Sequence, residues 1–330
     1  MSSSQALPLA VLGDKKSLSK EAQLEIDRLS KRHPFQFFAQ LFMAWAVIIA
    51  SIWLAVELQS AWMNILAIFI VATRQNILGL LVHEQAHCLG FKASYGDSLV
   101  NFLAAYPLIV LTVEGYSQVH LSHHRYFMTE QDPDLLRKSG KDWMFPMKAG
   151  HLGKLFLTDL LGLNLWQLIK GKKLDADFPL FKRPTCLPAW VRPAYYVFAA
   201  IIFTFTNSWD IFLLYWLVPL LTILQVIVRW GAICEHQYIP NATVAGCSPI
   251  IILQWWEKLL FPNLNFTLHP YHHYFPGIPF SSLPKVHEIF LREGLINEHN
   301  VFQGNLSYLK FLIKNQKDNE KMIRSPGNMS

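Results

Sequence analysis

The chain has little charge: of its 330 residues only 16% are Asp, Glu, Lys or Arg, against about 25% in an ordinary soluble domain. It has four cysteines and no Cys-x-x-Cys pair, so neither a disulfide framework nor a cysteine-based zinc site is predicted. It lacks internal repeats and has no apolar stretch before residue 35 of the kind that forms a signal peptide. Apolar residues, by contrast, make up 52%. This composition excludes disordered, coiled-coil and collagen-like chains and favours a multi-span membrane protein over a soluble enzyme.

Long apolar runs predict the membrane-spanning segments. A bilayer core of about 30 Å requires about 20 apolar residues in a helix. The stretch 187–233 is too long for one span and is interrupted by polar residues at 207–210, so it is interpreted as two. The predicted spans are residues 36–56, 61–82, 188–206 and 211–233. The predicted fold class is therefore an all-α membrane protein, with four transmembrane helices in two hairpins and a helical cap.

The basic residues indicate the orientation of this bundle. Two hairpins place both termini and the middle segment on one side, where Lys and Arg gather at 15–32, 137–173 and 310–324. The two turns on the other side, near 57–60 and 207–210, contain no Lys or Arg. Because basic residues favour the cytoplasmic side, the termini, the middle segment and the cap are predicted to be cytoplasmic. The net charge of +6 is therefore interpreted as membrane-flanking charge, and no nucleic-acid partner is predicted.

Eight of the 13 histidines fall into three short clusters, HEQAH at 83–87, HLSHH at 120–124 and HPYHH at 269–273. Residues three and four apart on a helix share a face, so each cluster can point several imidazoles at one metal. Chance gives about 0.5 HxxxH matches in such a chain but only about 0.02 HxxHH matches, so the two HxxHH boxes carry the signal. The candidate metal ligands are His83, His87, His120, His123, His124, His269, His272 and His273, with His236 at the end of the last predicted span as a ninth.

The number of imidazoles indicates which metals fit. Nine neutral imidazoles exceed the four ligands of one zinc, and imidazole also suits iron, copper and nickel. Two metals with four or five nitrogens each would use the whole set, and we choose iron because an iron pair can take up O2. Ligating imidazoles usually donate their other N–H to a carboxylate or carbonyl. The candidate acceptors are Glu84, Asp132, Asp134 and Glu235.

Three polar residues within the second predicted span leave two interpretations open. Arg74, Gln75 and Asn76 lie two to three helical turns before His83. Polar groups inside a span are expensive and usually face a cavity or a partner. They therefore either line a substrate pocket or serve helix–helix packing.

These boxes resemble those of the membrane fatty acid desaturase and hydroxylase superfamily. The likeness extends to RYFMTEQDPD after His124, to YFPGIP after His273 and to RWGAICEH before and including His236, and it covers about residues 35–285. The first box differs in carrying Glu84 where many acyl desaturases carry Asp, and the third opens with His269 where front-end desaturases have Gln. A haem-binding HPGG segment is absent, so no electron donor is fused to the chain.

The resemblance implies two iron ions held by the nine histidines, with O2 as co-substrate and an unactivated C–H bond as the target. The expected reaction introduces a double bond into a fatty acyl or lipid chain, and hydroxylation of a hydrophobic substrate is the alternative. Electrons would come from a separate ferredoxin, rubredoxin or cytochrome b5 with its reductase. The expected membrane is the bacterial inner membrane or the endoplasmic reticulum. We expect one membrane-enzyme domain over residues 1–330, with a cytoplasmic leader (1–34), a desaturase-like core (35–285) and a cytoplasmic C-terminal segment (286–330).

Two rival interpretations use fewer of these residues. HEQAH also fits the HExxH motif of zinc proteases, in which Glu84 is the base and His83 and His87 are ligands. That reading needs a third ligand, typically an Asp inside another span, but Asp210 lies in a predicted turn, and two boxes are left unused. A metal transporter is the second rival, but transport sites lie near the bilayer midplane and these histidines lie at its edge. Two irons per chain would support the di-iron enzyme, and one zinc would support the protease.

Overall fold

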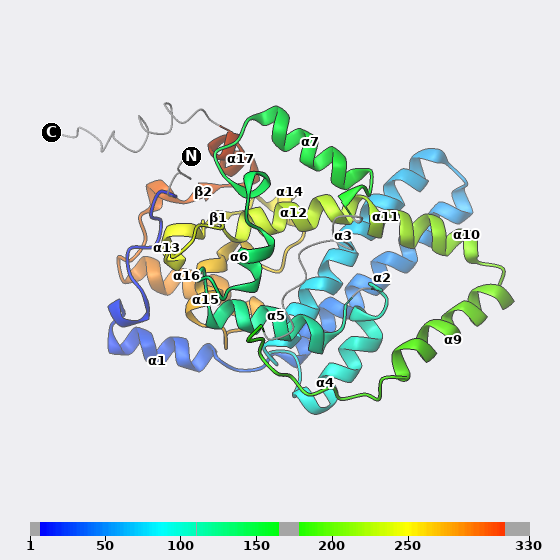
Figure 1. The fold of residues 1–330 in the computed structure, drawn as a ribbon, viewed down its shortest axis with the longest axis horizontal. Coiled ribbons are helices and arrows are strands. Elements are labelled where there is room, and N and C mark those ends of the chain that lie inside the picture. The colour runs from blue at the N-terminus through cyan, green and yellow to red at the C-terminus, as the bar shows by residue number, and fades with distance from the viewer. Residues whose placement is uncertain (1–6, 110, 165–177, 314–330) are drawn as a thin grey trace.

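The computed structural model describes residues 7–109, 111–164 and 178–313 of the chain. The described part is mostly helical, with one small two-stranded sheet (Figure 1). The first six residues of the predicted leader and residues 314–330 of the predicted C-terminal segment lie outside the described residues.

The first two predicted spans form a helical hairpin. They correspond to α2 (Pro34–Leu58) and α3 (Ala61–Ala86), which are joined by a turn with Gln59 in the left-handed conformation at φ 46°. The third long apolar helical run is Trp209–Glu235. Among the described residues, these three helices are long and apolar enough to cross a membrane. This finding indicates an integral membrane protein.

The remaining predicted span is shorter than expected. Helix α9 (Val191–Phe205) has 15 residues, or about 22 Å at 1.5 Å per residue, which is less than a bilayer core. It ends before Asn207, which has φ 50° and starts the turn into α10. The arrangement of four spans in two hairpins therefore stays a prediction.

The last apolar run is divided into pieces rather than forming one regular helix. Pro219 supplies no backbone N–H, which accounts for an interruption of regular helical hydrogen bonding in this region. The backbone also leaves helical geometry at Thr222, with φ −124° and ψ −89°. The pieces are α10 (Trp209–Phe212), the π-helical η4 (Leu213–Leu217), α11 (Val218–Leu221) and α12 (Ile223–Glu235).

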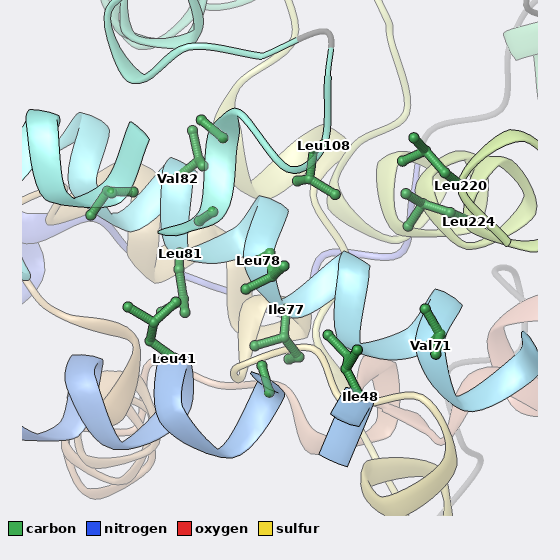
Figure 2. Close-up of a cluster of buried hydrophobic side chains, with 14 of the residues drawn as sticks. Leu41, Ile48, Val71, Ile77, Leu78, Leu81, Val82, Leu108, Leu220 and Leu224 are labelled. Carbon is green, nitrogen blue, oxygen red and sulfur yellow. The ribbon is translucent and has the colours of Figure 1, made fainter. Parts of the chain in front are cut away.

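An apolar core binds these helices together. Figure 2 shows side chains of α2, α3 and the α11–α12 region meeting, with Leu108 from the turn after η2 (Asn101–Ala105). The labelled core residues are Leu41, Ile48, Val71, Ile77, Leu78, Leu81, Val82, Leu108, Leu220 and Leu224. This core ends at the C-terminal end of α3, where the first histidine box begins.

Shorter elements form a cap at that end of the bundle (Figure 1). The leader is part of it: Val11 bridges Ile296, and the Ser19 hydroxyl and N–H donate to Glu293 at 3.1 and 2.9 Å. The helices of the cap are α1 (Lys20–Leu29), α4 (Ala93–Val100), α5 (Val113–Arg125), α6 (Pro133–Arg137), α7 (Ala149–Leu160), α13 (Val244–Cys247), α14 (Trp255–Leu260), α15 (His269–Tyr274), α16 (Leu283–Arg292) and α17 (Asn305–Ile313). The 3-10 turns are η1 (Lys15–Ser17), η3 (Lys141–Trp143), η5 (Phe266–Leu268), η6 (Phe280–Ser282) and η7 (Glu298–Asn300), and the parallel strands are β1 (Ile251–Ile252) and β2 (Phe302–Gln303).

Candidate metal centre

The three boxes lie on helix ends that converge. The first box occupies the last turn of α3, with His87 as its C-cap, and the second occupies the C-terminal half of α5. The third forms α15, in which Leu268 is the N-cap and His269 is the first helical residue. His236 is the C-cap of α12. Helical spacing therefore orients the imidazoles within each box, and the fold brings the boxes together.

The ring nitrogens gather into two groups. Those of His83, His87, His120 and His272 lie within 4.8 Å of one another, and so do those of His123, His236 and His273.

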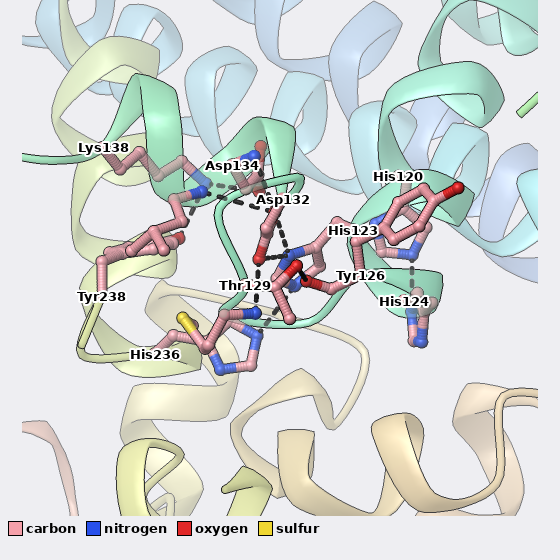
Figure 3. A network of polar contacts seen from close by, with 12 residues as sticks. His120, His123, His124, Tyr126, Thr129, Asp132, Asp134, Lys138, His236 and Tyr238 are labelled. Carbon is pink, nitrogen blue, oxygen red and sulfur yellow. Dashed lines mark hydrogen bonds and ion pairs between the residues drawn. The ribbon is translucent and has the colours of Figure 1, made fainter. Parts of the chain in front are cut away.

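The two remaining histidines of the boxes lie beside these groups. His124 Nε2 is 3.1 Å from His120 Nε2 and 3.0 Å from His272 Nε2. His269 Nε2 is 3.2 Å from His273 Nε2. Figure 3 shows His123 between His236 and the other two histidines of α5, His120 and His124. All nine predicted ligands are thus brought to one place by four separate elements.

The hydrogen bonding of these rings fits a metal centre. The Nε2 atoms of several rings face each other, as in the pair of His87 and His120 at 2.8 Å. If both rings are neutral, only one of these two nitrogens can carry a hydrogen and donate it to the other. Both ring nitrogens of His83, and Nδ1 of His269 and of His272, are buried without a partner among the described residues. Such orphaned groups are costly to bury. Bound cations would accept the converging lone pairs, and an all-imidazole set fits iron, copper, zinc or nickel.

The electrostatics also suit metal binding. Burial, reinforced by the positive charge that neighbouring imidazoles would carry, lowers the pKa of the histidines outside the spans well below the usual 6.5. These are His87, His120, His124, His236, His269, His272 and His273. Their rings are therefore neutral at pH 7, which is the form that coordinates metals.

Asp132 orients one of the histidines. His123 Nδ1 donates to its carboxylate at 2.8 and 2.9 Å, which leaves His123 Nε2 facing His236 Nε2 at 3.3 Å (Figure 3). Asp132 is fully buried, and it also accepts the N–H groups of Met128 and Asp134 at 2.8 Å as the N-cap of α6. A carboxylate held in this way fixes the tautomer and the orientation of the ring.

The other predicted carboxylates have different surroundings. Asp134 pairs with Lys138 at 3.0 Å, and Lys138 also donates to the Tyr238 hydroxyl at 2.7 Å. Attraction to Lys138 lowers the pKa of Asp134 although burial opposes it. Glu84 Oε1 accepts the N–H of Phe280 at 2.8 Å, and Glu235 is half-buried at the end of α12.

Sequence reasoning missed two residues that contact the boxes. Ser248 Oγ lies 2.6 Å from His236 Nδ1 and plays the part that was expected of a carboxylate. Arg183 donates to the carbonyls of Gln85 and Ala86 at 3.2 and 2.5 Å, between the two histidines of the first box. Neither residue belongs to a motif, and the spacing between a single Ser or Arg and the boxes carries no signal.

Arg183 belongs to an extended segment that links two ligand-bearing helices. Its guanidinium also holds Asp97 of α4 with two contacts of 2.6 and 2.8 Å. Two residues earlier, the Phe181 N–H donates to Ser122 Oγ at 2.6 Å, between His120 and His123 on α5. The segment therefore ties the end of α3 to α5.

A group of possible ligands outside the boxes is already engaged by protein. Oxygen and sulfur atoms of Asp97, Glu114 and Cys186 lie within 4.8 Å of one another. Asp97 is held by Arg183 and accepts from Gln85 at 2.8 Å, while Glu114 accepts from Asn101 at 2.9 Å. These contacts account for the group without a metal.

The polar residues inside α3 serve packing. Gln75 is fully buried and donates to the carbonyl of Trp216 in η4 at 2.9 Å, and Asn76 donates to the carbonyl of Pro262 at 3.4 Å. Arg74 contacts its neighbour Thr73 at 3.3 Å. Of the two interpretations, these contacts favour helix packing for Gln75 and Asn76.

The site is an all-histidine cluster able to hold metal ions, beside helices able to cross a membrane, and comparison with known proteins identifies the family. The model of the fatty acid desaturase family matches residues 60–304, which is most of the chain. The chain therefore belongs to the fatty acid desaturase family, its histidine clusters are consistent with the di-iron boxes of that family, and it is an enzyme. A comparison with curated proteins finds no match. The predicted resemblance is confirmed, and the family implies a lipid substrate.

Proposed function

We propose that the protein is an O2-dependent di-iron oxidoreductase that introduces a double bond into a fatty acyl or lipid chain. The observation that carries this proposal is the gathering of seven imidazoles into two groups of ring nitrogens, with the rings of His124 and His269 beside them. Two groups fit two metals, and the family favours iron. The zinc-protease rival is weaker, because His83 and His87 share their group with His120 and His272, and Glu84 is held by the backbone of Phe280.

We assign one iron to the group that contains the first box and the other to the group that contains His236. The first set is His83, His87, His120 and His272, the second is His123, His236 and His273, and His124 and His269 complete them. When bound and reduced, the iron pair supplies the activation of O2 that is needed to remove hydrogen from an unactivated C–H bond.

The protein residues prepare and enclose this centre. Asp132 and Ser248 bind Nδ1 of His123 and His236, so that Nε2 of each ring is directed at the metal position. Aromatic rings pack against the histidines: Phe266 lies 4.4 Å from His83 and Phe127 lies 4.6 Å from His273, between ring centroids. These rings exclude water from a site that must hold an apolar chain.

The fate of the substrate and the source of electrons complete the proposal. The family description favours formation of a double bond, and hydroxylation of a lipid or other hydrophobic substrate is the alternative. Two electrons for each turnover come from a separate ferredoxin, rubredoxin or cytochrome b5 with its reductase. The proposed enzyme spans the membrane four times and presents the centre to the cytoplasm, in the bacterial inner membrane or the endoplasmic reticulum. The distribution of Lys and Arg supports this orientation.

The test combines metal analysis with product analysis. Purified wild-type protein is expected to contain two irons per chain. Cells that express it and receive labelled lipids are expected to accumulate unsaturated products. Hydroxylated products would instead support the alternative. His272→Ala is expected to abolish turnover while the protein still inserts into the membrane, and near-normal product from this variant would refute the ligand assignment.

A further inference from the structure

Helix α14 has an outer face that is apolar. Trp255 is 76% exposed and Leu259 is 67% exposed, and three neighbours are also exposed. The α14 patch is defined as Trp255, Trp256, Leu259, Leu260 and Phe261. A soluble surface rarely presents two Trp, two Leu and a Phe in one short segment.

In a helix that faces water, the charged side chains point outward and the apolar ones inward. In α14 the carboxylate is buried and the apolar side chains are exposed. Glu257 is 2% exposed and is turned inward, where it accepts the N–H groups of Gln254 and Asn305 at 2.9 and 2.8 Å. Gly304, at φ 84°, permits this approach, because a Cβ there would lie 2.8 Å from a carboxylate oxygen of Glu257. Lys258 is exposed. The outer face thus combines apolar side chains with a single cation.

The position of α14 identifies what covers the patch. The ring of Phe261 packs edge-on against Phe69 at 5.7 Å, and the carbonyl of Pro262 accepts from Asn76 at 3.4 Å, both on α3. On α3, Phe69 lies fourteen residues and Asn76 seven residues before His83, so α14 meets the part of this helix that precedes the first box. Ile65 and Leu66 on the same stretch of α3 are 58% and 47% exposed. The patch therefore continues the lipid-facing surface of a membrane-spanning helix.

We propose that the α14 patch inserts into the lipid bilayer and anchors the cap beside α3. Trp residues are typical of the membrane interface, and a Lys on such a face extends its ammonium to lipid phosphates while its stem stays in apolar surroundings. The anchor is close to the chemistry in sequence, because residues 262–265 lead from α14 into η5 and the third box. The cap segment that holds His269, His272 and His273 is thus attached to the bilayer.

Spin labels in the full-length protein test this proposal. The protein is reconstituted into nanodiscs of phosphatidylcholine and phosphatidylglycerol, and Leu259→Cys is labelled. The collision rates of the label with O2, which concentrates in lipid, and with a water-soluble nickel chelate are then compared. Ile49→Cys on α2 (63% exposed) is the membrane control and Leu12→Cys in the leader (58% exposed) is the aqueous control. Labelled wild type supplies the background of the four native cysteines.

The expected result is a label at Leu259 that prefers O2 over the chelate, as at Ile49, while the label at Leu12 shows the opposite preference. Trp255→Cys gives a second position if Leu259→Cys does not fold. An aqueous signal at Leu259 together with a lipid signal at Ile49 overturns the proposal while the spans stand. A label protected from both reagents also overturns it, because it indicates that protein covers the patch. An aqueous signal at both positions would refute the spans themselves.

Discussion

Helices α2 and α3 are neighbours of almost equal length, with 25 and 26 residues, and both are apolar enough to cross a membrane. They differ in how much protein surrounds them: 22% of the most apolar stretch of α2 is buried, against 50% of that of α3. The buried residues of α2 are all apolar, whereas α3 also buries Gln75, His83, Glu84 and Gln85. Although their compositions are similar, α2 buries only apolar residues, whereas α3 also carries the first histidine box of the candidate metal centre.

The difference lies in what solvates the polar groups. Most of α2 is not covered by the described protein, and a lipid environment cannot satisfy polar side chains, which agrees with the few that this helix carries. On α3 other parts of the protein supply partners, such as the carbonyl of Trp216 for Gln75 and the N–H of Phe280 for Glu84. Apolar composition places both helices in the membrane, and neighbouring elements decide which of them can carry chemistry.

The largest effect is expected from substitution of His83, and His33 at the same end of this hairpin is the comparison. His83 lies in the last turn of α3, and His33 precedes α2 and binds Ser281 Oγ at 2.7 Å. His83→Ala is expected to reduce bound iron and to bring product formation below detection, because one metal loses a ligand. His33→Ala is expected to retain both. Equal losses in the two variants, measured as iron per chain and labelled product, would remove the distinction between the helices.

Acid is expected to destabilise the folded protein, because the buried histidines at the end of α3 and on α5 and α15 resist protonation. Their pKa values are lowered in the folded protein, so the unfolded chain binds more protons once the pH falls below 6.5. Stability is therefore full above pH 6.5 and declines as the pH falls below it. The midpoint of thermal unfolding of metal-free protein in micelles should fall steadily from pH 7 to pH 5.5. A midpoint that stays constant or rises over this interval would contradict neutral, buried rings.

Two arginines donate to carbonyls near the end of α3 from different surroundings. Arg183 is buried and neutralises Asp97, whereas Arg32, just before α2, is exposed and donates to the carbonyl of Cys88 at 2.9 Å. Arg183→Gln leaves the Asp97 charge unpaired and should lower the free energy of unfolding by about 3 kcal/mol. Arg32→Gln should cause no measurable change. Denaturant titrations in micelles measure both, and adding Asp97→Asn to Arg183→Gln should restore part of the loss.

The smallest effect is expected inside the spans. Gln75→Leu removes the hydrogen bond to Trp216 but also removes Oε1, which is buried without a partner among the described residues. The two changes oppose each other, so the free energy of unfolding should change by less than about 1 kcal/mol. Ser51→Ala on α2, whose hydroxyl donates to the carbonyl of Val47 one turn earlier, is the matched control. A loss of activity in Gln75→Leu with normal iron content would favour the pocket-lining interpretation instead.

The sequence predicted the parts of the centre that depend on local spacing. The three boxes, His236 and the apolar runs of α2 and α3 could be read directly, and Asp132 follows closely on the second box. The sequence did not indicate Ser248, which reaches His236 from a loop beyond α12, or Arg183, which approaches the first box from a segment 97 positions away along the chain. It also did not indicate the short α9 or the division of the last span, since both depend on local backbone geometry rather than on apolar composition.

By itself the sequence predicted apolar helices long enough to cross a membrane and imidazoles clustered on helix faces, because the length of an apolar run and the face of a helix are local properties. Only the tertiary structure decided which imidazoles share a group and which residues orient them. His124 and His272 lie 148 positions apart yet meet at 3.0 Å. Such a contact depends on how whole helices pack, and no pattern within either box specifies the partner.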